Sequence, residues 1–354
     1  MPIKEIRNLL GSEETLFSNS EVFNPDHIPE QFMFRDSQIK ELTFALKPAM
    51  SGGRPTNTFL IGNPATGKTT SIRLVFEQLA EATQKIIPVY INCHLNSSAF
   101  KIFSEIRKAV LGMPAPDTGI PITRVRDEVF SKLAKDGKAL VVALDDINYL
   151  FASGIADDVL YSILRCHESV SGAIASVFAI STEDVLHKLD DRVRSIFSPV
   201  RIDYHPYGSD EIFDILQARC EAGLYPDVLR PGLLRKITER TKDLRHGIEL
   251  VKQSAIAAEA DASRSIEERH VEKVMKSMQP PEASEDKVLI LSIARNQGPV
   301  ESGKLFSLVK EQREISYTSF YRILKKLESG RFIEIEHVAS SRGVKGRTSV
   351  IKAA

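Results

Sequence analysis

Residues 58–70 read Thr-Phe-Leu-Ile-Gly-Asn-Pro-Ala-Thr-Gly-Lys-Thr-Thr, and this stretch decides the fold. Four residues typical of a strand lead into Gly62, a loop closes on Gly67-Lys68-Thr69, and a helical pattern follows. The spacing is that of the P-loop, G-x-x-x-x-G-K-[ST], which binds the phosphates of a nucleotide. A strand-to-helix turn that matches by chance is the alternative. The apolar strand before the loop and the amphipathic helix after it favour the P-loop.

Each residue type in this loop has a physical reason. Gly62 and Gly67 let the backbone approach a phosphate without a Cβ in the way. Unpaired N–H groups of the loop and of the helix N-terminus attract an anion. Lys68 would reach the β- and γ-phosphates of ATP, and the Thr69 hydroxyl would bind Mg²⁺. The predicted nucleotide contacts in the loop are Gly62, Asn63, Pro64, Ala65, Thr66, Gly67, Lys68, Thr69 and Thr70.

The composition limits the number of domains and the classes of protein that remain possible. A chain of 354 residues predicts two or three domains, and a hydrophobic content of 42% is enough for their cores. The formal net charge is zero, so nucleic-acid binding has to be sought in local charge. Three cysteines without paired spacing argue against a disulfide framework or a zinc cluster. No signal pattern and no apolar run of about 20 residues is present, which predicts a cytoplasmic protein that does not enter a membrane.

Apolar runs alternate with helical patterns along the first two hundred residues. Strands are expected at 58–61, 86–92, 139–144, 175–181 and 200–204. Strands that alternate with helices predict a doubly wound α/β domain. The ligand of such a domain lies at the carboxyl ends of the strands, where the P-loop falls.

A second acidic motif, Asp145-Asp146, follows the continuous apolar run 139–144. One strand over from the P-loop, Asp145 would hold Mg²⁺ through water as a Walker B carboxylate. Asp146 would orient an attacking water. A carboxylate pair that merely caps a turn is the alternative. Because Asp146 is a methylene shorter than the usual Glu, slow hydrolysis is expected.

Three domains are predicted. Residues 1–205 form the α/β core with an insertion near 95–134, and residues 206–279 are all helical. A polar, proline-bearing stretch at 279–286 marks the next boundary. Residues 280–354 form a small third domain.

The C-terminal domain is expected to be a winged helix-turn-helix. Helices are predicted at 287–296, at 303–313 and after Ser316 as N-cap, with a wing of two strands at 332–338 and 348–352. The third helix would present one polar face to a DNA major groove. Cations between the wing strands would meet phosphates or a minor groove. The predicted DNA contacts are Ser319, Arg322, Lys326, Arg342, Lys345 and Arg347.

Charge is distributed unevenly between this domain and the rest of the chain. Residues 284–354 hold 13 Lys/Arg and 8 Asp/Glu, so they carry +5 and the remainder −5. That asymmetry is typical of a DNA-binding module on a neutral protein. A winged helix used for protein contacts is the alternative.

Together these residues resemble the AAA+ replication initiators. More narrowly, they are similar to the archaeal origin-binding ATPases, relatives of the eukaryotic origin recognition complex and its helicase-loading partner. The P-loop, the Walker B strand, Leu-Asp-Asp-Arg-Val-Arg-Ser at 189–195, a helical lid and a winged helix carry the resemblance. It extends from about Pro29 to the C-terminus, and it implies an AAA+ P-loop NTPase core.

The resemblance also implies roles for single residues. Arg35, in the motif 28–36, would lie beside the adenine. The segment 111–122 looks like the insertion that touches DNA, and Thr182 occupies the sensor 1 place. Arg192 or Arg194 would be the arginine finger, a choice that the sequence leaves open. Arg245 would be the sensor 2 arginine that meets the γ-phosphate from the lid.

Three positions depart from the family pattern. Thr182 replaces the usual Asn, Asp146 the usual Glu, and Asn148 the usual Asp. A weak ATPase that serves as an ATP- or ADP-bound switch is therefore expected.

The resulting hypothesis is a DNA replication initiator that uses ATP, ADP and Mg²⁺. It would bind double-stranded origin DNA, help to load the replicative helicase and work with paralogous initiators. A monomer is expected in solution and a multimer on DNA. The alternatives are an ATP-sensing transcription regulator and a remodelling or clamp-loading AAA+ ATPase.

Overall fold

The structure is a computed structural model that describes residues 15–116, 118–278, 285–313, 315–329, 332–339 and 347–353. The chain divides into two compact units, Met1–Val271 and Glu272–Ala354. Each unit has its own hydrophobic core.

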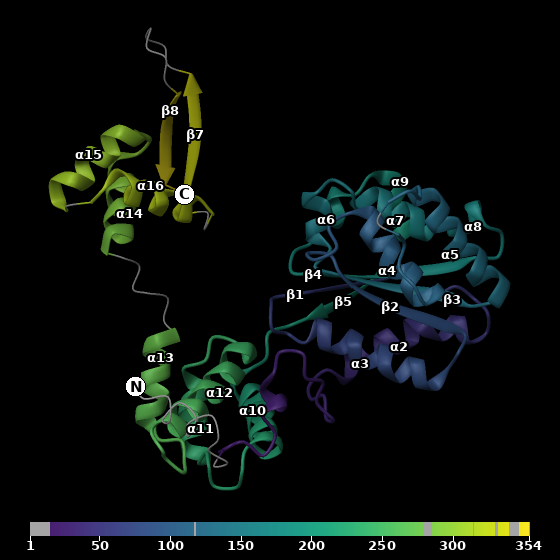
Figure 1. The fold of residues 1–354 in the computed structure, drawn as a ribbon, viewed down its shortest axis with the longest axis horizontal. Coiled ribbons are helices and arrows are strands. Elements are labelled where there is room, and N and C mark those ends of the chain that lie inside the picture. The colour runs from purple at the N-terminus through teal and green to yellow at the C-terminus, as the bar shows by residue number, and fades with distance from the viewer. Residues whose placement is uncertain are drawn as a thin grey trace. The chain divides into compact units, whose positions relative to one another are not determined.

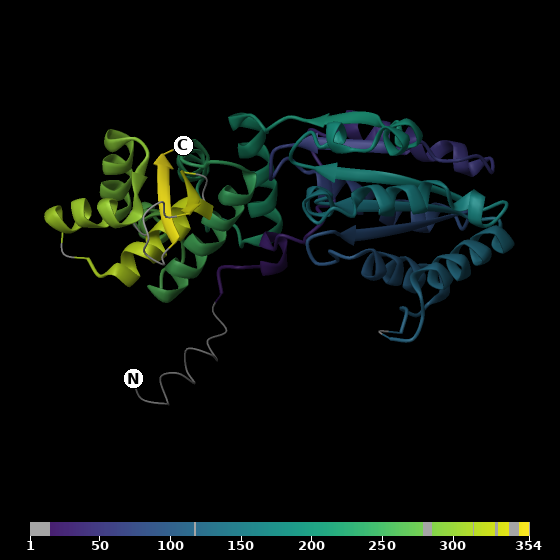
Figure 2. The ribbon, with the colours of Figure 1, turned by 90° about the horizontal axis from the view of Figure 1, so that it is seen from above.

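A five-stranded parallel sheet forms the centre of the first unit. Its strands run with their carboxyl ends at one edge, where the arrowheads gather in Figure 2. The doubly wound α/β prediction is confirmed. In spatial order, the strands are β2 (Ile86–Asn92), β3 (Ala139–Asp145), β4 (Ile174–Ser181), β1 (Thr58–Gly62) and β5 (Val200–Tyr204).

The strand order corrects one expectation. β1 pairs with β4 and β5, so β4 lies between the P-loop strand and β3, the strand that ends at Asp145. Strand order depends on which faces pack together, and local apolar runs do not report it. The P-loop therefore has to cross the end of β4 to reach Asp145.

Helices cover both faces of this sheet (Figure 1). One face packs against α2 (Asp36–Met50) and α3 (Lys68–Ala82). The α3 residues Ile72, Val75 and Phe76 are buried there because they recur at helical spacing. The other helices of the core are α4 (Ala99–Leu111), α5 (Ile122–Asp136), α6 (Asn148–Ala152), α7 (Ala156–Leu164), α8 (Cys166–Ser169) and α9 (Asp191–Phe197), with the short 3-10 helix η2 (Leu186–Lys188).

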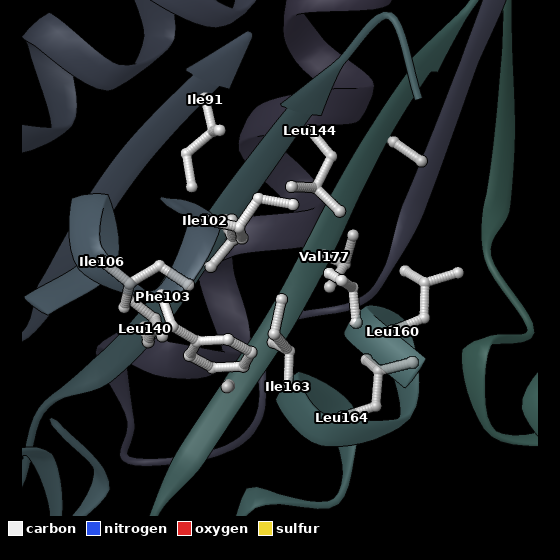
Figure 3. Close-up of a cluster of buried hydrophobic side chains, with 14 of the residues drawn as sticks. Ile91, Ile102, Phe103, Ile106, Leu140, Leu144, Leu160, Ile163, Leu164 and Val177 are labelled. Carbon is white, nitrogen blue, oxygen red and sulfur yellow. The ribbon is translucent and has the colours of Figure 1, made fainter. Parts of the chain in front are cut away.

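The larger core cluster lies between the sheet and α4, α5 and α7. Strands alternate their side chains between two faces, so one set of strand residues meets this layer. Figure 3 shows side chains from three strands meeting those of α4 and α7. The labelled residues are Ile91, Leu140, Leu144 and Val177 from the strands, Ile102, Phe103 and Ile106 from α4, and Leu160, Ile163 and Leu164 from α7.

Four helices follow the sheet: α10 (Ser209–Gly223), α11 (Pro231–Glu239), α12 (Leu244–Ala260) and α13 (Glu268–Met278). Residues 17–27 contact these helices and the residue that follows α10. Phe17 forms a β-bridge with Leu224, and Arg219 of α10 donates hydrogen bonds to the carbonyl oxygens of Val22 and His27. The short helix η1 (Ser20–Phe23) lies in this segment.

The second unit contains a winged helix, as the sequence predicts. Its helices are α14 (Glu285–Gln297), α15 (Ser302–Gln312) and α16 (Tyr317–Ser329), and β6 (Val300–Glu301), β8 (Arg347–Ala353) and β7 (Ile333–Ala339) form an antiparallel sheet in that order. The sequence interpretation missed β6, which has only two residues. Among the described residues, no helix is long and apolar enough to cross a membrane.

Candidate nucleotide-binding site

A cavity of about 780 Å³ lies at the carboxyl edge of the sheet. Its walls come from the P-loop, the ends of β3 and β4, the N-terminal segment and the helices α10 and α12. The volume lies within the usual range for pockets that bury small ligands and cofactors. The predicted site residues in its walls are Pro64, Ala65, Thr66, Gly67, Lys68, Thr69, Thr70, Asp145, Asp146, Thr182 and Arg245.

The P-loop folds tightly around its own lysine. Nζ of Lys68 donates hydrogen bonds of 2.7 Å to the carbonyl oxygens of Gly62 and Asn63. Burial lowers the pKa of Lys68, while the nearby carboxylates of Asp145 and Asp146 act in the opposite direction. A cation with so little contact with water interacts strongly with an anion that enters the cavity.

Gly67 is required at the turn into α3. Its φ of +91° belongs to the left-handed region, which glycine adopts without a steric cost. A Cβ at this position would lie 2.8 Å from Oη of Tyr207 and 3.1 Å from the ring of Phe32. Both aromatic rings line the cavity, so a larger residue at 67 would displace its wall.

The side chains of Asp145 and Thr69 are in contact across the end of β4, which lies between β3 and β1 in the sheet. Oγ1 of Thr69 donates a 2.7 Å hydrogen bond to Oδ2 of Asp145, which is 4% exposed. A hydroxyl, a carboxylate and substrate phosphates are the oxygen ligands that Mg²⁺ usually takes. Among the described residues there is no cluster of three or more His, Cys, Asp or Glu side chains that could hold a metal ion.

Asp146 follows β3 in a left-handed conformation, with φ of +54°. Aspartate tolerates this conformation better than most residues. Burial, and next the charge of Asp145, raise the pKa of Asp146, whereas Lys68, His94 and Arg245 lower it. Its carboxylate is therefore part of one electrostatic cluster with the P-loop lysine and Arg245, which comes from the first turn of α12.

Arg35 differs from the expectation because it does not line the cavity. Its buried guanidinium donates hydrogen bonds to the carbonyl oxygens of Thr66, Phe34 and His205 and stacks 3.8 Å from the ring centroid of Tyr207. Arg35 thus joins the P-loop to the connector between β5 and α10. Gly62 and Asn63 also lie outside the main cavity and line a smaller depression of about 250 Å³ beside Thr182.

The structure separates the two finger candidates. Arg194 donates hydrogen bonds of 2.8 Å to the carbonyl oxygen of Leu189 and 3.2 Å to that of His187, and it pairs with Asp191. Arg192 is 85% exposed, and its pair with Asp190 is 3.5 Å long. Of the two, Arg192 is the one whose guanidinium points into solvent.

The sequence interpretation placed only the motif 28–36 beside the nucleotide and missed the contribution of the residues before it. Asn19–Met33 supplies several wall residues, opposite Ile215 and Ala218 of α10 and Ile248 of α12. These apolar side chains suit the faces of a planar base. Burial, and next the charge of Arg219, lower the pKa of His27 within this wall. The repeated Pro and Asn residues of this segment gave no periodic signal.

The buried face of α16 determines which of its predicted DNA contacts are exposed. Phe320, Ile323, Leu324 and Leu327 pack in the core of the unit. Arg322 and Lys326 are exposed, whereas Ser319 is half-buried and its hydroxyl accepts a 3.0 Å hydrogen bond from Ser316. Arg342 and Lys345 lie outside the described residues, and Arg347 begins β8.

The loop between α4 and α5 is held by Arg107, which donates to the carbonyl oxygens of Met113 and Pro114.

The fold and the cavity define an AAA-type P-loop ATPase with a helical lid, a class that binds adenine nucleotides. Profiles of known families agree: the AAA ATPase domain matches residues 31–177, and the Cdc6 AAA+ ATPase-type lid domain matches residues 213–276. The chain belongs to the family of archaeal ORC1-type DNA replication proteins. ORC1-type DNA replication protein 2 of Methanothermobacter thermautotrophicus is 39% identical, over 98% of this chain and 94% of that protein.

A second relative and a solved structure complete the comparison. ORC1-type DNA replication protein 2 of Methanosarcina acetivorans is 36% identical, over 98% of this chain and 95% of that protein. The ORC1 protein of Aeropyrum pernix, solved in complex with DNA, matches with a TM-score of 0.72 over 96% of this chain and 94% of that chain. At 23% identity, that likeness shows the shared fold.

Proposed function

We propose that this protein is an ATP-regulated replication initiator that binds double-stranded origin DNA. One observation carries the proposal: a single cavity joins the P-loop and Asp145 of the core to Arg245 of the lid. Nucleotide bound there contacts both parts and sets the lid position. The winged helix is the part that binds DNA.

The proposed roles in the cavity follow from charge and geometry. Lys68 and the loop N–H groups hold the phosphates, and the apolar wall beside Ile215 and Ile248 holds the adenine base. Thr69 and Asp145 hold Mg²⁺, which neutralises charge on the phosphates. Asp146 orients water toward the γ-phosphate, which Arg245 meets from the lid.

Slow hydrolysis is part of the proposal. Asp146 and Thr182 both line the cavity, but both are shorter than the residues usual in such ATPases. Catalysis of phosphoryl transfer depends on positioning to within about 1 Å. A slow reaction leaves the protein in one nucleotide state for long periods, as a switch requires.

Arg192 is proposed as the arginine finger that reaches the nucleotide of a neighbouring protomer on DNA. Arg192→Ala is expected to lower the ATPase rate on DNA by about 1,000-fold, the lower end of what an arginine finger contributes, because it removes a cation from the transition state. The affinity of the isolated chain for ATP stays unchanged. Turnover measured on origin DNA, and fluorescent-nucleotide titration without DNA, give the two quantities.

Arg194→Ala is the matched control, two residues away on the same helix. Since the guanidinium of Arg194 binds the carbonyl oxygens of its own loop, its removal is expected to lower the thermal stability more than the rate. A rate lost in Arg194→Ala and kept in Arg192→Ala would reverse the assignment.

DNA binding is proposed for the winged helix on two grounds. The Aeropyrum pernix ORC1 protein was solved in complex with DNA. In this chain, residues 284–354 carry a net charge of +5. We propose that the segment near 112–130 adds a second contact, and that Arg342, Lys345 and Arg347 reach phosphates from the wing.

Arg322→Ala is expected to weaken binding to double-stranded DNA by about tenfold. The slope of log affinity against log salt concentration should become shallower by about one, because one fewer counterion is released on binding. The reason is that an exposed arginine on α16 is placed to meet a base edge or phosphate. Fluorescence anisotropy at several salt concentrations measures both effects. Arg295→Ala, which removes an exposed arginine from α14 of the same unit, is the control and should change neither.

Genome-wide mapping of the wild type and Arg322→Ala tests the biological role. Wild-type sites at replication start points, lost in the variant, support an initiator that works with paralogues and helps to load the helicase at the nucleoid. Sites at scattered promoters would indicate a transcription regulator. An absence of DNA sites would favour a remodelling ATPase whose winged helix binds protein.

A further inference from the structure

We propose that Tyr90 is a positioning residue for the metal site, because it holds the Asp145 carboxylate in the orientation that binds Mg²⁺ together with Thr69. The inference rests on the proposed nucleotide site and names a residue that the P-loop and Walker B motifs do not include. Tyr90 lies on β2, the edge strand next to β3.

The register of the sheet brings the two side chains together. Tyr90 is the neighbour of Ala143 and Asn92 is the neighbour of Asp145, so positions 90, 92, 143 and 145 share one face. This is the face covered by α3. The phenol spans the diagonal to Asp145, and its Oη lies 2.7 Å from Oδ2. Diagonal neighbours are within reach of an aromatic side chain.

Three donors from three segments fix the carboxylate. Oδ2 of Asp145 accepts hydrogen bonds from Tyr90 and from Thr69, each 2.7 Å long, and Oδ1 accepts one of 3.0 Å from the N–H of Asp146. Each donor restrains the plane of a side chain that is otherwise free to rotate. The phenol is the only one of the three that belongs neither to the P-loop helix nor to β3 and its turn.

Tyr90 is itself held in place. The guanidinium of Arg73 lies 5.0 Å from the centroid of its ring, and Arg73 pairs at 2.8 Å with Asp26 of the N-terminal segment. Arg73 follows Thr69 by one helical turn on α3.

The orientation of the Asp145 carboxylate affects the affinity of the site for metal. Thr69 and Asp145 would hold Mg²⁺, and the hydrogen bonds from Thr69 and Tyr90 keep the Asp145 carboxylate in one orientation. Partners that orient a metal ligand typically contribute about 10- to 100-fold to metal affinity. Tyr90→Phe keeps the ring and its contact with Arg73 but removes the donor.

The test measures metal binding directly, with Mn²⁺ in place of Mg²⁺. Electron paramagnetic resonance reports free Mn²⁺ during titration of the full-length protein with ATP bound. We expect Tyr90→Phe to need about tenfold more Mn²⁺ than the wild type for half-saturation. ATP affinity measured in EDTA stays at the wild-type value. Tyr204→Phe removes a buried phenol from the same core cluster, but from β5, and should bind Mn²⁺ like the wild type.

Two results would overturn the proposal. One is wild-type Mn²⁺ affinity in Tyr90→Phe. The other is an equal loss of ATP affinity in EDTA, since that loss would mean that the phenol supports the fold of the pocket instead of the metal ligand. A wild-type protein that fails to bind ATP both in EDTA and with Mg²⁺ present would instead overturn the nucleotide site on which the inference rests, so the two failures are distinguishable.

Discussion

Lys68→Ala is expected to weaken ATP binding by about 100-fold, which corresponds to about 3 kcal/mol. Lys68 is 7% exposed, and its Nζ donates hydrogen bonds to carbonyl oxygens of the P-loop. Hydrogen bonds between ionised partners are stronger than neutral ones. Arg245 of the lid also lines the cavity, and so does Arg219 of α10, whose guanidinium already donates to the carbonyl oxygens of Val22 and His27. Isothermal titration with ATP, with and without Mg²⁺, measures the loss.

Lys40→Ala is the control, because Lys40 is exposed on α2 and lies outside the cavity. It should bind ATP like the wild type. Basal DNA binding should persist in Lys68→Ala, since the winged helix belongs to the other unit. An unchanged ATP affinity in Lys68→Ala would refute the P-loop assignment.

Gly62→Ala is expected to lower the free energy of unfolding by about 3 kcal/mol, at the upper end of the usual cost of overpacking. An added Cβ would overlap the carbonyl oxygen of Tyr204 and lie 2.9 Å from the Cβ of that residue. The opposing atoms belong to β5, which pairs with β1 at this point, so a rotamer change cannot relieve the overlap. Urea denaturation without nucleotide measures the stability apart from ligand binding.

Gly232→Ala is the matched substitution. A Cβ on Gly232, near the start of α11, would meet no atom within 4 Å. Because alanine restricts the unfolded chain and suits a helix, this variant should be more stable than the wild type by about 0.5 kcal/mol. A Gly62→Ala protein as stable as the wild type would mean that β5 shifts away from β1 without cost.

The sequence by itself determined the features that depend on neighbouring residues. The P-loop, the strand ending at Asp145 and the buried face of α16 each rest on a short pattern whose residues are adjacent or one helical turn apart. Such patterns are local, because the backbone of each residue sets the direction of the next few side chains. The α/β class and the winged helix followed from the order of these patterns.

The tertiary structure alone decided which distant residues meet. Tyr90 and Asp145 are 55 positions apart, and their contact depends on the register between β2 and β3. Arg35 and His205 are 170 positions apart, and their hydrogen bond places the Arg35 guanidinium at the connector between β5 and α10. A strand or helix pattern shows that an element forms, but not which element lies beside it. That choice is made by the packing of whole faces, and it fixed the strand order, the surroundings of Asp145 and the exposure of Arg192.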